Sequence, residues 1–153
     1  MAELIYNEQG RLLFTEEMRK DFTILIPMML PIHFTLLEKI FNIHGYKVKL
    51  LKTNNRKIVD EGLRNVHNDT CYPALLVIGQ MLSALKSGEY DLNKTALMIT
   101  QTGGGCRASN YINLLRKALK KNGFENVPVV SLNLSSMEKN PGFSLSPKLL
   151  YQL

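Results

Sequence analysis

The sequence predicts an α/β domain with an open, mostly parallel, doubly wound sheet of about four strands, covered by helices on both faces and preceded by an N-terminal hairpin. Apolar runs of strand length alternate with amphipathic runs of helical length along the chain. A long excursion over residues 52–94 separates the second predicted strand from the third. Because crossovers are right-handed, helices can cover both faces only if the chain reverses direction across the sheet, and this excursion provides the reversal.

Length and composition are those of an ordinary soluble domain. The chain has 153 residues, of which 45% are hydrophobic and 21% charged, and this is enough to bury one core. The longest apolar runs break within about ten residues, well short of the roughly 20 that a bilayer requires. Two cysteines and the lack of a basic-then-apolar leader predict a cytoplasmic protein without a disulfide scaffold.

The net charge of +6 does not by itself predict an anionic partner. Basic residues gather at residues 47–57 and 116–121. Lys120 and Lys121 fall in the last turn of a predicted helix, where cations complement the helix dipole. We therefore expect neither a nucleic-acid partner nor a membrane partner.

The first half of the chain reads as a hairpin followed by a β-α-β unit. Residues 5–14 predict the hairpin, turning at residues 7–10, and residues 15–20 a short helix or linker. The continuous apolar run 22–28 is typical of a strand buried on both faces. Residues 33–44 show helical spacing up to Gly45, and the alternating run 46–51 predicts a second strand nearer the edge.

The second half adds two helices, a strand, a helix and a last strand. Helices are expected at 56–66 and 73–86, the latter capped by Asp69 or Thr70, stopped by Gly88 and deeply buried. A strand at 95–100, a helix from 111 to about 122 and a strand at 127–132 follow. No element is predicted after Ser135. We divide the chain into a hairpin and linker at 1–20, an α/β domain at 21–135 and a tail at 136–153 that leads into further sequence.

This order of elements is Rossmann- or flavodoxin-like, and it predicts where a ligand site lies. Ligands of open α/β sheets bind beyond the carboxyl ends of the strands, where the strand order reverses. The first strand ends at residues 27–31 and the third at residues 100–105. Cys106 falls directly on this edge, and Cys71, just ahead of the helix at 73–86, is expected to fall there too.

The glycine-rich segment after the third strand carries the main chemical signal. Gly103, Gly104 and Gly105 leave backbone amides uncovered at the mouth of a helix, where negative charge is favoured. The thiolate of Cys106 is the candidate for that charge, as a reactive thiol or a metal ligand. The segment lacks the G-x-G-x-x-G spacing of dinucleotide-binding folds and the Gly-Lys-Ser/Thr of a P-loop.

The residues alone leave several functions open for the two cysteines. Two thiols on one edge suit iron–sulfur or zinc binding, or redox exchange, but no C-x-x-C pair decides between them. A cysteine hydrolase would need a histidine base from among His33, His44 and His67, and His67 lies four residues before Cys71. Single cysteines also commonly serve as small buried hydrophobes.

Three segments, residues 27–33, 68–74 and 100–111, resemble the 2-hydroxyglutaryl-CoA dehydratase-like proteins. The resemblance is to the branch of CoA-substrate-specific enzyme activase-related proteins, often fused behind an ATP-dependent activase domain. In that family cysteine thiolates hold a 4Fe-4S cluster. The activase hydrolyses ATP and passes one electron to the cluster, and the dehydratase reduces a 2-hydroxyacyl-CoA thioester to a ketyl radical from which the hydroxyl leaves.

The resemblance implies a role for particular residues. Cys71 and Cys106 would be cluster ligands, while Arg107, Ser109 and the glycine amides would tune its potential through hydrogen bonds to sulfur. Family subunits use three cysteines and this chain has two, so His33 is the first candidate for a further ligand. A nucleotide-binding pattern is also absent from the sequence.

We therefore expect a fragment that supplies half of a cluster site and is inactive alone. Its expected partners are an activase domain or protein, a further domain or subunit bearing cluster ligands, and an acyl-CoA substrate. Cys106 is expected to be the more reactive thiol, because Arg107 and the open amides of the glycine-rich loop lie beside it. The alternative is a non-catalytic α/β module whose glycine-rich loop binds phosphate or CoA, or docks a partner.

Overall fold

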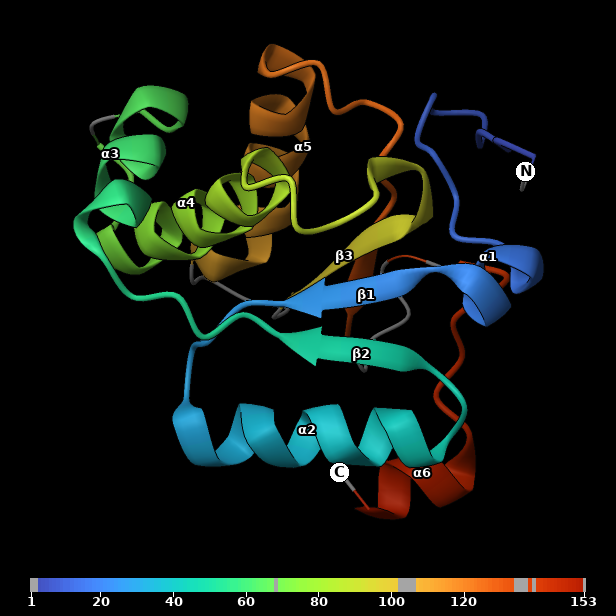
Figure 1. Ribbon diagram of the computed structural model, residues 1–153. Helices are drawn as coiled ribbons and strands as arrows, with labels where there is room; N and C mark the ends of the chain where they lie inside the picture. The colour runs from blue at the N-terminus through green and yellow to red at the C-terminus, as the bar shows by residue number, and fades with distance from the viewer. Residues whose placement is uncertain (1–2, 68, 102–106, 134–137, 139, 153) are drawn as a thin grey trace.

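Four parallel strands form the centre of the molecule. The computed structural model describes residues 3–67, 69–101, 107–133, 138 and 140–152. The strands are β1 (Thr23–Ile26), β2 (Lys47–Leu50), β3 (Thr95–Thr100) and β4 (Val129–Leu132), in the order β2-β1-β3-β4. All three pairings are parallel (Figure 1). The predicted open, parallel α/β sheet is therefore confirmed.

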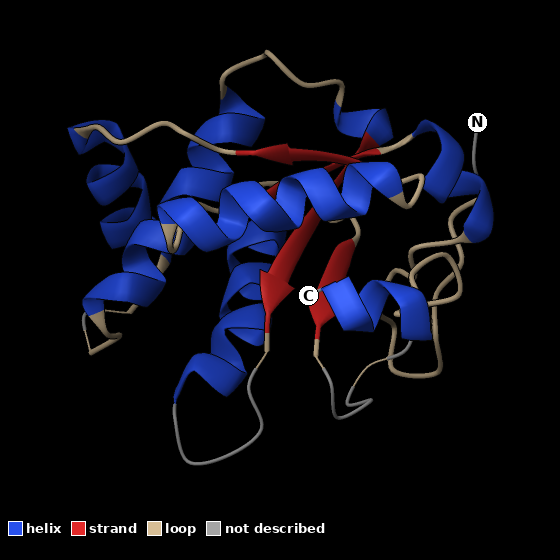
Figure 2. Ribbon diagram, turned by 90° about the horizontal axis from the view of Figure 1, so that it is seen from below, coloured by secondary structure: helices blue, strands red, loops and turns tan. Residues whose placement is uncertain are grey.

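Helices cover both faces of the sheet, as predicted. The helices are α1 (Glu16–Asp21), α2 (Pro31–Ile43), α3 (Arg56–Asn65), α4 (Tyr72–Lys86), α5 (Tyr111–Lys121) and α6 (Pro147–Gln152), with short 3-10 turns at Leu92–Lys94 and Arg107–Asn110. Figure 1 shows α3, α4 and α5 on one side of the strands, and α2 and α6 on the other. Figure 2 shows the same layers from below, with α2 in front of the strands. The chain changes sides between β2 and α3, within the long excursion.

The two faces of the sheet bury two separate apolar clusters. Along β3, Leu97 and Ile99 enter the cluster under α4 and α5, while Ala96 and Met98 enter the cluster under α2. β3 is an inner strand with an apolar cluster on each of its faces, which is why its sequence is a continuous apolar run. The edge strand β2 alternates buried and exposed residues instead.

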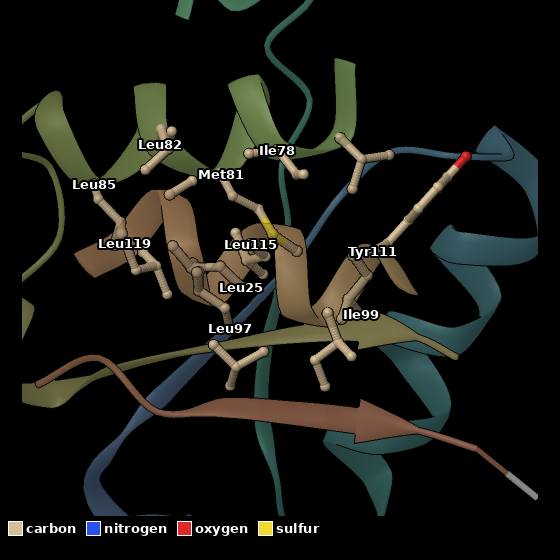
Figure 3. Packing of buried hydrophobic residues seen from close by; sticks show 14 of the residues in the cluster. Leu25, Ile78, Met81, Leu82, Leu85, Leu97, Ile99, Tyr111, Leu115 and Leu119 are labelled. Carbon is tan, nitrogen blue, oxygen red and sulfur yellow. The ribbon is translucent and has the colours of Figure 1, made fainter. Parts of the chain in front are cut away.

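Helix α4 is the most buried helix, as its lack of a polar face predicted. Most of its side chains are buried, and Figure 3 shows Met81, Leu82 and Leu85 directed toward α5 and the strands beneath it. On its other side α4 touches α3 through glycines. A Cβ atom at Gly79 would lie against the backbone carbonyl of Ile58, and one at Gly62 against that of Leu75. The helices approach this closely because neither position carries a side chain.

The tail contains structure that the sequence analysis did not predict. The expectation of no element after Ser135 is wrong, because α6 forms there and its Leu149 is buried in the cluster under α2. The tail is also tied to the N-terminal segment, since the amide of Gly142 donates to the carbonyl of Phe14 at 2.8 Å. The predicted hairpin is reduced to one antiparallel bridge between Tyr6 and Leu12.

Other boundaries agree with prediction to within a few residues. Gly45, Gly88 and Gly123 follow helices with positive φ, as predicted for the first two. The predicted cap of α4 is wrong, because Cys71 takes the N-cap position in place of Asp69 or Thr70. No helix in the described part of the chain has the length and apolar character needed to cross a bilayer.

Candidate functional site

The topological switch point lies between β1 and β3, at their carboxyl ends. From β1 the chain passes to α2 on one face, and from β3 it passes to α5 on the other. The ends of the two strands are in contact, since the Thr100 hydroxyl donates to the Met29 sulfur at 3.7 Å. In a fold of this kind the switch point is where ligands bind.

Cys71 lies at the start of α4 with its side chain exposed. Its Sγ atom is 2.8 Å from the hydroxyl oxygen of Tyr111, the first residue of α5. Tyr111 is only 5% exposed, so its ring is held by the core while its hydroxyl reaches the sulfur. The structure therefore places Cys71 beside the N-terminus of the helix that follows the glycine-rich loop.

The local sequence explains why Cys71 takes this position. A turn closes before it, with the Thr70 amide donating to the His67 carbonyl at 2.9 Å. The Cys71 carbonyl then accepts the first helical hydrogen bonds from Ala74 and Leu75. Pro73 falls in the first turn, where its missing N–H leaves no hydrogen bond unmade. Burial along α4 begins only at Ala74, so the start of the helix, with Cys71, is exposed.

A polar network joins the chain on both sides of the glycine-rich loop. The side chain of Gln101, the residue after β3, accepts from the Ser131 hydroxyl at 2.7 Å and donates to the Ser109 carbonyl at 3.2 Å. The side-chain amide of Asn133 donates in turn to the Ser131 hydroxyl at 2.7 Å. Gln101 thereby links β3, β4 and the turn Arg107–Asn110. Sequence reasoning named Ser109 but missed Gln101, whose partners lie far along the chain.

Gln80 is a second residue that the sequence analysis missed. Its side chain is buried, accepts from the Met28 amide at 2.8 Å and donates to the carbonyls of Leu51 at 3.0 Å and Thr53 at 2.8 Å. One side chain of α4 thus fixes the segments that leave β1 and β2. The signal available in the sequence was a glutamine inside the otherwise apolar run 74–82 of α4.

The predicted site residues are only partly brought together by the described structure. Gly103, Gly104, Gly105 and Cys106 lie outside the described residues, and Arg107 begins the turn Arg107–Asn110. The prediction that the Cys71 and Cys106 sulfurs share one crevice therefore stays a prediction.

The histidines lie in different surroundings. His33 is exposed in the first turn of α2, at the carboxyl edge of the sheet but on the face opposite to α4 and α5. His44 caps the far end of α2, at the other edge of the sheet. The His67 ring contacts the Asp69 carboxylate at 3.3 Å, and both side chains are exposed.

An iron–sulfur cluster fits Cys71 as one ligand but is not completed by the described residues. Cluster ligands are cysteine thiolates, and an exposed sulfur at an open sheet edge is accessible to a cluster. In the described part of the chain, no three His, Cys, Asp or Glu side chains form a group able to hold a metal ion. Of the ligands that a cluster needs, the described residues therefore offer the Cys71 sulfur.

The fold and the site define a doubly wound α/β domain with an exposed thiol at its switch point. Residues 23–91 match the family model described as CoA enzyme activase uncharacterised domain (DUF2229). The matched segment runs from β1 to just beyond α4 and includes His33 and Cys71. No curated protein and no solved structure matches the chain. Residues 23–91 are thus similar to a CoA enzyme activase domain, which confirms the activase-related resemblance predicted from the sequence.

Proposed function

We propose that this domain supplies cysteine thiolates to a 4Fe-4S cluster shared with a further domain or subunit. The observation that carries the proposal is the exposed sulfur of Cys71, held by the Tyr111 hydroxyl at the switch point. The family match supports the same reading, because it places Cys71 within an activase-like domain. The wider system would be a 2-hydroxyacyl-CoA dehydratase, driven by an ATP-hydrolysing activase.

The second proposed ligand is Cys106. It precedes Tyr111 by five residues, and the four intervening positions form the turn Arg107–Asn110. Tyr111 therefore connects the two cysteine segments, touching one through its hydroxyl and following the other in sequence. His33, at the same edge of the sheet, is the candidate for a further ligand from this chain, and the partner would supply the rest.

Each surrounding residue would have a defined task. The Tyr111 hydroxyl would hold the Cys71 sulfur and donate a hydrogen bond to it, an interaction that tunes cluster potential. Gln80 would fix the segments after β1 and β2, and Gln101 the two sides of the glycine-rich loop. The bound cluster would accept and release one electron. The assembled protein would bind the acyl-CoA substrate and the activase.

Anaerobic reconstitution with iron and sulfide tests the proposal. Iron and acid-labile sulfide per chain are measured for the native protein, Cys71→Ala, Cys106→Ala and the double variant, with His67→Ala as a control that alters an exposed neighbour. We expect weak, substoichiometric incorporation in the native chain and in the control, because the ligand set is incomplete. Each cysteine substitution should abolish it, and His33→Ala should reduce it.

The other outcomes contradict the proposal in distinguishable ways. Loss through one cysteine only would reduce the assignment to a single ligand. Incorporation retained in the double variant would exclude a cluster at these positions. Iron-free protein that instead binds CoA or inorganic phosphate, measured by calorimetry, would favour the alternative in which the glycine-rich loop is an anion-binding site.

A further inference from the structure

Helix α2 carries a row of exposed apolar side chains on the side turned away from the sheet. Ile32 is 82% exposed, Leu36 53% and Ile43 77%. Together with Leu30, these are four of the ten large hydrophobic side chains that are exposed in the described part of the chain. Exposed apolar side chains that gather on one helix face mark interaction sites in soluble proteins, whereas isolated exposed residues do not.

The spacing of this row is that of a helix-docking seam. Ile32, Leu36, Lys39 and Ile43 are separated by four, three and four residues, which is the spacing of alternating a and d positions in a heptad. The inner face of α2 carries its own row, formed by Phe34, Leu37 and Phe41, which packs under the sheet. The seam is therefore a second apolar face of α2, and it takes no part in the core.

The polar side chains of α2 beside the seam make hydrogen bonds within the domain. Few polar groups therefore remain at the borders of the seam. The Thr35 hydroxyl donates to the carbonyl of Pro31, and the Asn42 side chain bonds to Val48 and Glu38. The Glu38 carboxylate accepts from the Leu50 amide at 2.9 Å. Figure 1 shows α6 beside the C-terminal end of α2 and no other described element on the outer side of the helix.

Lys39 decides what kind of partner fits. It is exposed within the seam, and none of the ion pairs of the described residues involves it. If two copies of α2 docked in parallel, Lys39 would face Lys39. If they docked antiparallel with the seams aligned, Lys39 would face Leu36. Either arrangement buries a cation without a counter-charge, which is costly.

We propose that α2 docks an amphipathic helix of a partner protein, with an Asp or Glu of that helix facing Lys39. A single charged residue at a seam position sets partner choice and register in this way. The seam from Ile32 to Ile43 is about 16 Å long, at 1.5 Å per residue, so the partner needs about three helical turns. This inference does not depend on the cluster proposal.

Two synthetic helical peptides of about 21 residues test the inference, because three turns must form stably. Both carry Leu on one face, and a single central position of that face is Glu in one peptide and Lys in the other. NMR titration of the full chain is the readout, since it detects weak binding and locates it. We expect the Glu peptide to shift the signals of Ile32, Leu36 and Ile43, and the Lys peptide to bind about tenfold more weakly.

Variants of exposed residues make the test specific without endangering the fold. The double variant Ile32→Ser/Ile43→Ser should lose binding, whereas Leu63→Ser, at an exposed residue of α3, should keep it. Lys39→Glu should reverse the preference between the two peptides. Equal binding of both peptides, signal shifts away from α2, or no binding of the Glu peptide would each overturn the inference. So would a native dimer, seen by sedimentation, that the Ile32→Ser/Ile43→Ser variant abolishes.

Discussion

The hydroxyl of Tyr111 and the sulfur of Cys71 meet between the starts of two helices, 2.8 Å apart. The tyrosine is buried and the cysteine is exposed, so the core fixes the hydroxyl and the hydroxyl fixes the sulfur. The two residues are 40 positions apart in the sequence. The position of an exposed thiol thus depends on the packing of α5 as well as on its own helix.

A double-mutant cycle should detect this contact as coupling between the two residues. Tyr111→Phe keeps the ring in the core and removes the hydroxyl, so we expect a loss of about 1 kcal/mol in unfolding free energy. When Cys71→Ala is already present, the same substitution should cost less, by about 0.5 kcal/mol or more. Urea denaturation of the four proteins measures the difference. His67→Ala in place of Cys71→Ala is the control and should give additive losses.

Gln80 should be among the most sensitive polar positions of the domain. Gln80→Met has a similar volume but leaves the Met28 amide and the carbonyls of Leu51 and Thr53 without this partner. We expect a loss of about 2–3 kcal/mol, since buried groups that lose their hydrogen bonds carry the cost of desolvation. Ser83→Ala, on the same helix, should change stability by less than about 0.5 kcal/mol. A loss for Gln80→Met as small as that would contradict the role of Gln80.

The variant Gln80→Glu should make this cost depend on pH. A carboxylate there would be buried and would face two carbonyl oxygens, so the pKa of the introduced carboxyl rises above its unfolded value of about 4.3. The folded state then binds more protons than the unfolded state between the two pKa values, and stability falls as pH rises through this window. Urea denaturation should show the variant approaching the native protein as pH falls from neutral to about 4. A difference that is independent of pH would contradict the burial of this group.

Gly79→Ala should destabilise the domain, although alanine is the better helix former. In an ordinary helix this substitution gains up to about 1 kcal/mol. Here the added Cβ would meet the Ile58 carbonyl, so α3 and α4 must separate, at a cost of about 1–3 kcal/mol for overpacking. Thermal and urea denaturation measure the sign directly. A more stable variant would show that the two helices can separate freely.

Elements whose burial is encoded locally were predictable from the sequence. Strand β3 and helix α4 are long and apolar, and their limits agree with prediction almost to the residue. Helix α6 was missed because it has six residues and depends on the burial of Leu149 against distant elements. The seam on α2 was also missed, because the apolar residues of the inner face account for the helical pattern by themselves.

The place of Cys71 was predictable, but its contacts were not. The order of strands and helices predicted Cys71 at the carboxyl edge of the sheet, and it lies there beside Tyr111. That this edge binds a ligand stays a prediction. The contacts of Cys71 with Tyr111, and of Gln80 with three backbone groups, follow from packing between distant segments. Such contacts cannot be predicted from sequence spacing, so the residues that position Cys71 were identified only from the structure.

Gln101 offers a test of how the glycine-rich loop is supported. Its side chain joins the Ser131 hydroxyl to the Ser109 carbonyl, on the two strands and the turn that flank residues 102–106. Gln101→Met keeps the length of the side chain and removes both bonds, and should cost about 1–2 kcal/mol in stability. Ser131→Ala removes only one of these two bonds, together with the bond from the Asn133 side chain, and is the matched control.

The same pair of variants separates support of the loop from general stability. If the Ser109 bond holds the loop for cluster binding, Gln101→Met should take up less iron than Ser131→Ala in anaerobic reconstitution, at a temperature where both are fully folded. Thiol titration confirms that both cysteines are present and reduced in each protein. Equal iron uptake in the two variants would mean that Gln101 stabilises the sheet without positioning Cys106. If iron uptake falls only in Gln101→Met, the bond between Gln101 and Ser109 positions Cys106, because Ser131→Ala retains that bond and Gln101→Met does not.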